Sequence, residues 1–290
     1  MPVLTSAVGY RQSIVAEVTP RWALAYSASL DLRDEIYLDD ARPGGVVVPP
    51  TFCVCLEWAL VGSPKRAEHF QLNETERRRG VHFVQDSTFF KPIRTGTRVQ
   101  TTSEIVYVRN TSAGAYVLTR LESSDEATGE LLVKSWSGSL LRGVPAERPE
   151  IGVLPPDYQP PADSGPVTGD EDEVLIDRAQ PHLYTECARI WNPIHTERRV
   201  ALAAGLDDII VHGTATWAIA AREIARHRAG GNLGRLRRLA GSFRALIIPG
   251  TRIRVVHAPD ENGGGYRFNV LNAANVSALS SGFVEFDGAG

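Results

Sequence analysis

Residues 93–99 read IRTGTRV, and residues 247–253 read IIPGTRI. Their glycines, Gly96 and Gly250, lie 154 positions apart (250 less 96), which is about the length of one domain. Each copy follows a phenylalanine, Phe90 or Phe243, and precedes a run of alternating residues typical of a strand. A glycine followed by threonine is typical of a turn that opens such a strand. The repeat predicts that one fold occurs twice in the chain.

An apolar segment that predicts a buried helix lies upstream of each copy. These segments cover residues 50–61 and 214–225. The first is apolar nearly all round, whereas the second is expected to carry Arg222, Glu223 and Arg226 on an outer face. Strands are expected after each helix, at residues 99–107, 116–122, 131–141, 266–271 and 276–286. One buried helix wrapped by an antiparallel sheet, present twice, predicts an α+β fold.

A proline-rich segment, residues 143–173, lies between the two copies. It contains seven prolines and ends in an acidic cluster. Because proline neither donates to a strand ladder nor continues a helix, the segment predicts a semi-rigid linker. The expected domains are therefore residues 1–142 and residues 174–290.

The composition excludes several classes of protein. The 290 residues are 43% hydrophobic and 22% charged, as in ordinary globular proteins. A net charge of -3 argues against a general nucleic-acid binder. No apolar run approaches the roughly 20 residues that span a bilayer, and no signal peptide is evident, so we expect a cytoplasmic protein without a membrane partner. The three cysteines show no metal-binding spacing and predict reduced thiols.

The densest polar segment reads YTECARIWNPIH at residues 184–195, and VHG follows at residues 211–213. The Asn192–Pro193 pair favours a turn, which leaves Asn192 and His195 on a loop between ordered elements. Gly213 stands at the start of the second predicted helix, where unpaired N–H groups and the helix dipole favour a carbonyl oxygen or an anion. A histidine beside such a helix start suits proton transfer on a polarised carbonyl compound.

These residues resemble the MaoC-like acyl dehydratases, the family of (R)-specific enoyl-CoA hydratases and 3-hydroxyacyl thioester dehydratases. The family fingerprint is a tyrosine, then Ser-Gly-Asp-x-Asn-Pro-Leu/Ile-His, then Leu-His-Gly at the start of the long helix. Residues 192–195 and 211–213 match it, with Tyr184 upstream. The first half resembles the usual N-terminal companion domain at residues 48–52, 81–86 and 90–93. The resemblance implies a double hot dog whose first copy is non-catalytic and shapes the substrate tunnel.

The resemblance also assigns roles to individual residues. It implies that His195 moves the proton, that Asn192 orients His195, and that the Gly213 N–H binds the thioester carbonyl, with His212 in support. One position departs from the family: the aspartate that acts with the histidine is replaced by Ile190. An isoleucine accepts no proton, so the usual two-residue acid–base mechanism does not carry over.

Three interpretations of Ile190 stay open. If the segment is helical, Glu186 shares a face with Ile190, about 6 Å away, and supplies the missing carboxylate. Alternatively, His195 acts alone in an isomerisation, a lyase reaction or a ring closure. Otherwise, the protein is a non-catalytic partner subunit or an acyl-binding protein. Tyr184 and Trp191 are candidates to line the acyl pocket, although aromatic residues beside an apolar helix commonly belong to the core.

Two features of the first half allow other interpretations. His82 and Asp86 are spaced as an acid–base pair. Glu57, on the first predicted helix, suits a hot-dog thioesterase, in which a helix carboxylate is the base or nucleophile, but it equally fits a paired group in the core.

The sequence and the resemblance together predict a hydro-lyase that acts on a 3-hydroxyacyl or 2-enoyl thioester of coenzyme A or a carrier protein. No metal and no redox cofactor are expected, and a homodimer is the expected assembly. Arginine side chains suit phosphate, so three of them are candidates to bind the phosphates of the thioester handle: Arg235, Arg237 and Arg238.

Overall fold

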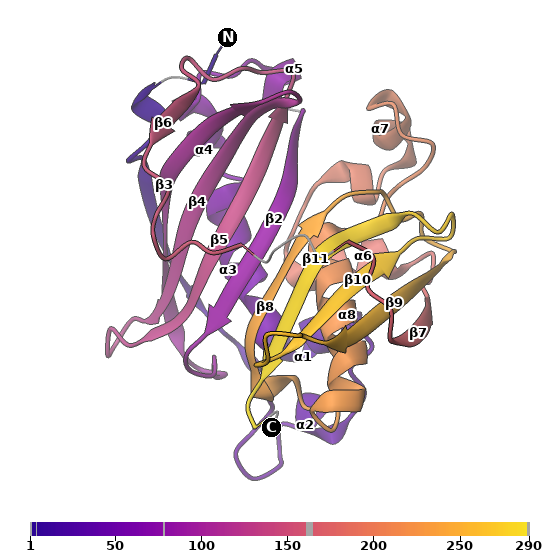
Figure 1. Cartoon of the computed structure of the whole chain (residues 1–290). Coiled ribbons are helices and arrows are strands. Elements are labelled where there is room, and N and C mark those ends of the chain that lie inside the picture. Colours follow the sequence, from indigo (N-terminus) through magenta and orange to yellow (C-terminus); the bar gives the residue numbers. More distant parts are fainter. Residues whose placement is uncertain (1, 4, 78, 161–164, 289–290) are drawn as a thin grey trace.

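The computed structural model describes residues 2–3, 5–77, 79–160 and 165–288, and its two halves repeat one order of elements (Figure 1). The N-terminal half contains β1 (Arg11–Glu17), α1 (Pro20–Ser29), α2 (Glu35–Leu38), α3 (Cys53–Val61), α4 (Pro64–His69), α5 (Glu74–Arg77), β2 (Gly80–Phe89), β3 (Arg98–Thr111), β4 (Gly114–Asp125) and β5 (Leu131–Arg142). After β6 (Glu150–Gly152), the C-terminal half contains β7 (Asp170–Leu175), α6 (Gln180–Ala188), α7 (Arg198–Ala203), α8 (Gly213–Arg228), β8 (Leu236–Phe243), β9 (Arg252–Pro259), β10 (Tyr266–Leu271) and β11 (Ser277–Phe286).

The strands form one continuous sheet in the order β1-β3-β4-β5-β2-β8-β11-β10-β9-β7, with β6 on β3. Read from its two ends, this order is the same in both halves, with β1 matching β7 and β2 matching β8. The halves meet where β2 and β8 pair antiparallel, from Val84 opposite Ser242 to Thr88 opposite Arg238. This symmetry and the expected strands confirm the predicted duplication and the α+β class.

The two glycine turns of the repeat make the same contacts in both halves. Gly96 has φ 82° and Gly250 has φ 87°, a left-handed conformation that favours glycine. The Gly96 N–H donates to the Val18 carbonyl over 2.8 Å, and the Gly250 N–H donates to the Ile176 carbonyl over 2.7 Å. Val18 directly follows β1 and Ile176 directly follows β7, so each turn fixes the end of its half's first strand.

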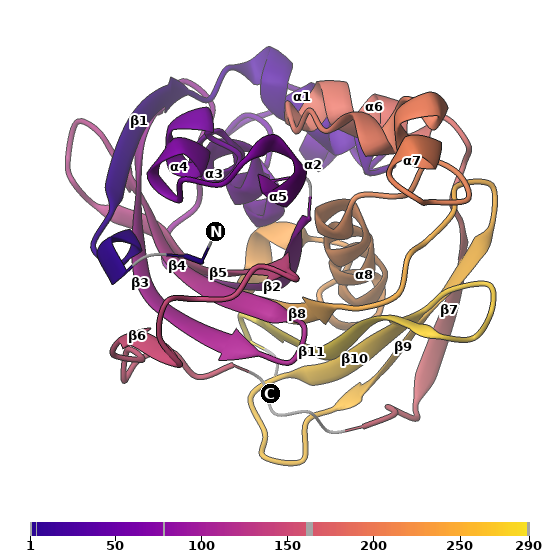
Figure 2. The same ribbon diagram turned by 90° about the horizontal axis from the view of Figure 1, so that it is seen from above.

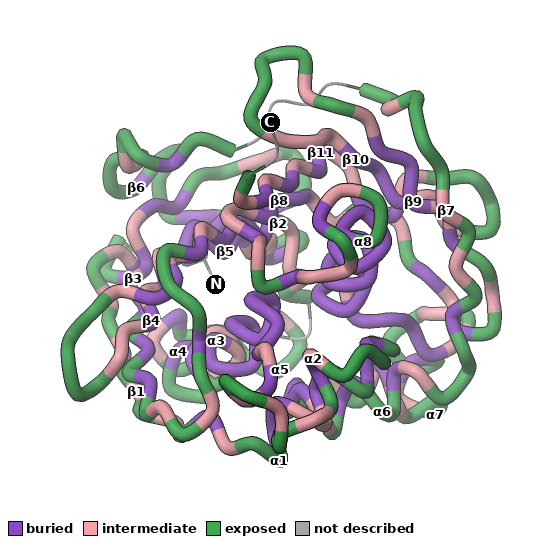
Figure 3. The backbone as a smooth tube through the Cα atoms, turned by 90° about the horizontal axis from the view of Figure 1, so that it is seen from below, coloured by how far each residue is buried: buried purple, intermediate pink, exposed green. Residues whose placement is uncertain are grey.

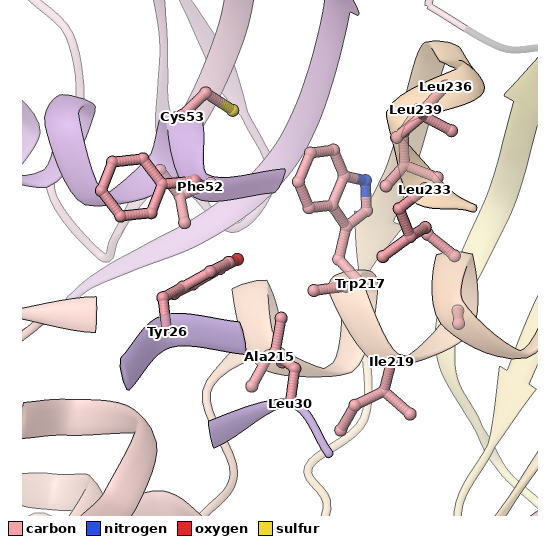
Figure 4. Packing of buried hydrophobic residues seen from close by; sticks show 14 of the residues in the cluster. Tyr26, Leu30, Phe52, Cys53, Ala215, Trp217, Ile219, Leu233, Leu236 and Leu239 are labelled. Carbon is pink, nitrogen blue, oxygen red and sulfur yellow. The ribbon is translucent and has the colours of Figure 1, made fainter. Parts of the chain in front are cut away.

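The sheet curves round α3 and α8, and α1 and α6 lie side by side across its open side (Figure 2). Both central helices are largely buried (Figure 3). The main core draws on both halves: the Trp217 ring of α8 lies between Phe52 and Cys53 on one side and leucines of the second half on the other (Figure 4). The two hot dogs therefore share one core. Among the described residues, no helix combines the length and the apolar character needed to cross a membrane.

The structure corrects the expected outer face of α8. Arg222 and Glu223 are buried, with 7% and 3% of their surface exposed. The Arg222 Nη1 donates to the Leu30 carbonyl over 2.6 Å, and its Nε donates to Glu223 over 2.7 Å. The prediction was wrong because the chain that follows α1 covers this face of α8, which helical periodicity does not reveal. Arg226 is exposed, as expected.

The proline-rich segment follows the sheet rather than standing apart from it. β6 pairs with β3, and Tyr158 packs on Trp136 and lies 3.1 Å from the Tyr116 hydroxyl. The acidic end of the segment is strand β7, which pairs with β9, so the expected boundary at residue 173 falls inside a strand. Residues 161–164 of the segment lie outside the described residues.

Candidate active site

The polar segment at residues 184–195 begins in α6 and ends in a short 3₁₀ turn. Helix α6 stops because Arg189 adopts a left-handed conformation, with φ 58°. Asn192 then caps the 3₁₀ turn at Pro193–His195, where its side-chain oxygen accepts from the Ile194 N–H over 3.4 Å. This pair of chain reversals turns His195 toward the start of α8. Asn192 therefore shapes the turn that carries His195, and its orienting role in catalysis stays a prediction.

His195 is buried and is held in one tautomer. Its Nδ1 lies 2.8 Å from the Ile210 carbonyl, which only accepts, so Nδ1 carries the proton and donates. Burial lowers the pKa of His195 to about 4, although the bond to Ile210 acts in the opposite direction. The ring is therefore neutral near pH 7, and Nε2 keeps a lone pair with which to accept a proton.

His212 lies against His195 in a stacked arrangement. Their ring centroids are 3.7 Å apart and their planes differ by 23°. The His212 Nε2 lies 3.0 Å from the Thr185 hydroxyl and 3.4 Å from the Ile190 carbonyl. Burial, and secondarily the neighbouring His195, lower the pKa of His212. Two neutral imidazoles therefore occupy the site together.

Gly213 is the first residue of α8 and directly follows His212. The N–H groups of the first helical turn lack partners within the helix, and the helix dipole adds partial positive charge there. A Cβ on Gly213 would lie 3.0 Å from the Phe243 ring, so glycine allows the helix start to pack closely on β8. The site thus places a hydrogen-bond donor for a carbonyl oxygen next to the two histidines.

Tyr184 is fully buried beside this helix start. Its hydroxyl donates to Thr214 over 3.1 Å, and its ring centroid lies 5.0 Å from that of His212. Across the boundary between the halves, the ring centroid of Tyr26 in α1 lies 5.9 Å from that of Tyr184. Burial raises the pKa of Tyr184, so the hydroxyl stays protonated and acts as a donor. Tyr184, His195, His212 and Gly213 thus gather at one place.

Some contributors to the site carry no sequence motif. Thr185 and Thr214 contact the predicted residues His212 and Tyr184, and each stands next to a motif residue in the chain. The Ile210 carbonyl, which sets the tautomer of His195, is a main-chain group that no sequence pattern marks.

The structure does not place the residues around the replaced aspartate as the sequence predictions require. These residues are Ile190, Glu186 and Trp191. The Ile190 side chain is 3% exposed and belongs to the main core. Glu186 is exposed on α6, and α6 ends before Ile190, so the expected shared helical face does not form. Trp191 is 60% exposed and does not line a buried pocket.

The three arginines predicted to bind phosphate have partners within the protein. Arg235 bonds to the main-chain oxygen of Asp287, and Arg237 pairs with the carboxylate of Asp287. Arg238 donates to Asp86 over 3.0 and 2.8 Å. A phosphate has to compete with these contacts.

The alternative candidates of the first half also have partners within the protein. Asp86 pairs with Arg238, whereas His82 Nε2 lies 3.0 Å from the Val84 carbonyl, so the expected His82–Asp86 pair does not form. The Glu57 carboxylate is buried and accepts from Gln85 over 3.0 Å and from Ser135 over 2.5 Å. Burial raises the pKa of Glu57, which makes it a satisfied polar group of the core.

Comparison with protein families divides the chain in the same way as its fold. Residues 33–143 match the MFE-2 hydratase 2 N-terminal domain, and residues 162–275 match the MaoC-like domain. The chain is 29% identical over 183 residues to the peroxisomal multifunctional enzyme type 2 of Drosophila melanogaster, covering 60% of this chain and 29% of that protein. It is 25% identical to the 3-hydroxyacyl-thioester dehydratase Y of Mycobacterium tuberculosis, covering 71% and 72% of the two chains.

Solved structures show the same architecture. The MaoC-like dehydratase of Phytophthora capsici superposes with a TM-score of 0.82 over 96% of both chains, at 17% identity. The full-length Drosophila enzyme gives 0.76 over 96% of this chain and 48% of that chain, at 22% identity. A Mycobacterium tuberculosis protein described as a double hot dog gives 0.62 over 96% of both chains, at 16% identity. The chain spans 29% and 51% of the lengths of two of its curated relatives.

Proposed function

This chain joins an MFE-2 hydratase 2 N-terminal domain to a MaoC-like domain in a double hot dog, and we propose that it adds water reversibly to a 2-enoyl thioester. One feature carries this function. His195 is neutral, its Nδ1 is fixed on the Ile210 carbonyl, and its Nε2 remains available beside the start of α8. A base of this kind next to a carbonyl-binding helix start suits chemistry at the carbons adjacent to a thioester.

In the proposed reaction, the Gly213 N–H donates to the thioester carbonyl oxygen. His195 Nε2 takes a proton from water while the water oxygen bonds to C3. The electron pair of the C2–C3 double bond moves toward the carbonyl oxygen, and the resulting enolate is stabilised by the N–H groups at the start of α8. Protonated His195 then returns its proton to C2, so that one molecule of water is added. The reverse sequence removes water from a 3-hydroxyacyl thioester.

Ile190 limits this scheme to one proton-transfer group. An isoleucine at the family's aspartate position leaves His195 to carry the proton in both directions. General acid–base groups typically contribute about 10²–10⁴-fold to a rate. We therefore propose a slower hydratase than relatives that keep the aspartate. The thioester handle, coenzyme A or a carrier protein, the homodimer and the cytoplasmic location stay predictions from the sequence.

The same replacement favours a second candidate, the isomerisation or ring closure of a related acyl substrate. Moving a proton between two carbons needs one base and no bound water. His195 supplies that base, and the buried Ile190 side chain keeps the position apolar. The two candidates differ in the mass of the product, because only hydration adds water.

The test is mass-resolved turnover of the purified chain with 2-enoyl and 3-hydroxyacyl thioesters of coenzyme A and of a carrier protein. We expect gain or loss of one water, abolished in His195→Gln and retained in His69→Gln. His69 stacks on Tyr10 in the N-terminal half and is a matched control outside the site. A product of unchanged mass would support the isomerase. No turnover on any substrate would overturn both and leave a partner-subunit role.

A further inference from the structure

A second polar cluster lies at the opposite end of α8 from the proposed active site. It contains Asp172 of β7, His227 in the last turn of α8, and His257 of β9. The His227 Nε2 lies 2.9 Å from one carboxylate oxygen of Asp172, and the His257 Nε2 lies 3.5 Å from the other. One donor atom from each residue can be chosen so that all three lie within 4.8 Å of one another.

His257 is the unusual member of this cluster. Its side chain is fully buried, and neither ring nitrogen has a hydrogen-bond partner. One carboxylate oxygen of Asp172 is also buried without a hydrogen-bond partner. Buried polar atoms in proteins are almost always paired, and an unpaired one costs about 1–3 kcal/mol. The His257 Nε2 and this Asp172 oxygen face each other over 3.5 Å, which points to a ligand that satisfies both.

The surrounding charges leave the cluster open to a cation. Burial, and secondarily the positive charge of Arg228, lower the pKa of His257, whereas the charges of Asp172 and Asp170 act in the opposite direction. Arg228 itself pairs with Asp170 and lies over the Tyr266 ring at 4.9 Å. Because side chains alternate along a strand, Glu171 and Glu173 point to the other face of β7. There they pair with two arginines of β9 at 2.7 Å each, Arg254 and Arg252. The Asp172 carboxylate therefore faces the two histidines.

We propose that Asp172, His227 and His257 bind a divalent transition-metal ion of the zinc type. Imidazole nitrogens favour such ions over Mg²⁺ and Ca²⁺, which prefer oxygen ligands. Zinc–ligand bonds of about 2.0–2.1 Å in a tetrahedron hold neighbouring ligand atoms about 3.3 Å apart. The two imidazole nitrogens lie 2.9 and 3.5 Å from different oxygens of the Asp172 carboxylate, and one donor atom from each residue lies within 4.8 Å of the others, so the donor atoms are near this spacing. Water supplies the fourth ligand from the side of His227, whose side chain is 44% exposed.

The site is remote from the catalytic histidine. His227 follows Gly213 by 14 positions in one helix, which corresponds to about 21 Å. A bound ion would connect β7, α8 and β9 at the outer edge of the second hot dog. The bound ion therefore acts on stability and not on proton transfer. The proposed metal site does not depend on the proposed hydratase activity.

The experiment uses the full chain after treatment with a chelator. Zn²⁺ is titrated calorimetrically, and the zinc retained after desalting is counted. The variants are His227→Gln, whose ligand is partly exposed and so tolerates substitution, and Asp172→Asn. His69→Gln is the matched control. Melting temperatures without metal establish that each variant is folded.

We expect one retained zinc in the chelator-treated chain and in His69→Gln, with a raised melting temperature. Each ligand variant should bind at least about tenfold more weakly, because even outer-shell partners of metal ligands contribute that much. Mg²⁺ should cause no shift. Three results would overturn the site: no retained zinc, equal zinc in all variants as from binding at Cys187, or a loss in only one of the two ligand variants.

Discussion

Acidification offers a quantitative test of the buried state of His195. The pKa of His195 is about 4 in the folded chain, compared with an ordinary value of 6.5. Below about pH 6.5 the unfolded chain therefore binds a proton that the folded chain does not. The contribution of neutral His195 to the free energy of unfolding is therefore complete above that pH. It is lost progressively as the pH drops toward about 4.

The size of the effect follows from the difference in pKa. A gap of about 2.5 pH units at about 1.4 kcal/mol per unit corresponds to about 3 kcal/mol for His195. About 2 kcal/mol of this is lost between pH 7 and pH 5, because about 1.5 of the 2.5 units separate the ordinary pKa of 6.5 from pH 5. His212 acts in the same direction, since burial lowers its pKa too.

Urea unfolding near pH 7 and near pH 5 measures this loss. Glutamine in His195→Gln keeps an N–H donor but does not titrate. The variant should lose about 2 kcal/mol less than the wild-type chain over this range, and His69→Gln should behave as wild type. An equal loss in wild type and His195→Gln would refute the burial of a neutral His195.

Three further predictions concern the rate of thioester hydration. The value of kcat/KM should stay level from about pH 7.5 to about pH 5 and fall near pH 4, where His195 gains its proton; a fall near pH 6.5 would contradict this. Ile190→Asp should raise the rate at least about tenfold while lowering stability by about 3 kcal/mol, and Ile190→Asn should lower stability without raising the rate. A gain in neither variant would show that the position has lost its catalytic geometry. Gly213→Ala brings a Cβ to 3.0 Å from the Phe243 ring and should lower kcat/KM about tenfold; unchanged kinetics would remove Gly213 from the site.

The duplicated fold was predictable because its signal is local. Gly96 and Gly250 each need a left-handed turn, and each turn makes the same hydrogen bond to the end of a first strand. The environment of Arg222 and Glu223 was not predictable. Their burial depends on contact with the chain around Leu30, almost two hundred residues away in the sequence. Helical periodicity describes only the helix itself and cannot predict such a contact.

Strand β7 was concealed by its composition. Its residues begin Asp-Glu-Asp-Glu, and acidic residues are uncommon in strands, so the sequence favours a linker here. The structure pairs two of its side chains with arginines of β9, which offsets the charge of this edge strand. A strand that depends on cross-strand ion pairs is recognised only when its partner strand is known.

The two clusters differ in how far the sequence reveals them. His195 and Gly213 belong to two short motifs, residues 192–195 and 211–213, which mark them as candidates in the sequence. In the structure, His195 stacks on His212, which directly precedes Gly213 at the start of α8. The three residues of the proposed metal site form no motif. His227 follows Asp172 by 55 positions, and His257 follows His227 by 30. Only the pairing of β7 with β9 and the end of α8 bring them together.

Hydration in isotopically labelled water tests the proposed chemistry most directly. The chain is incubated with a 2-enoyl thioester in water that carries heavy oxygen, and the product is examined by mass spectrometry. We predict a 3-hydroxyacyl thioester that contains one heavy oxygen at C3, formed by the wild-type chain and by His69→Gln but not by His195→Gln. A product without heavy oxygen, or labelling at the same rate in His195→Gln, would contradict the proposed role of His195 in water addition.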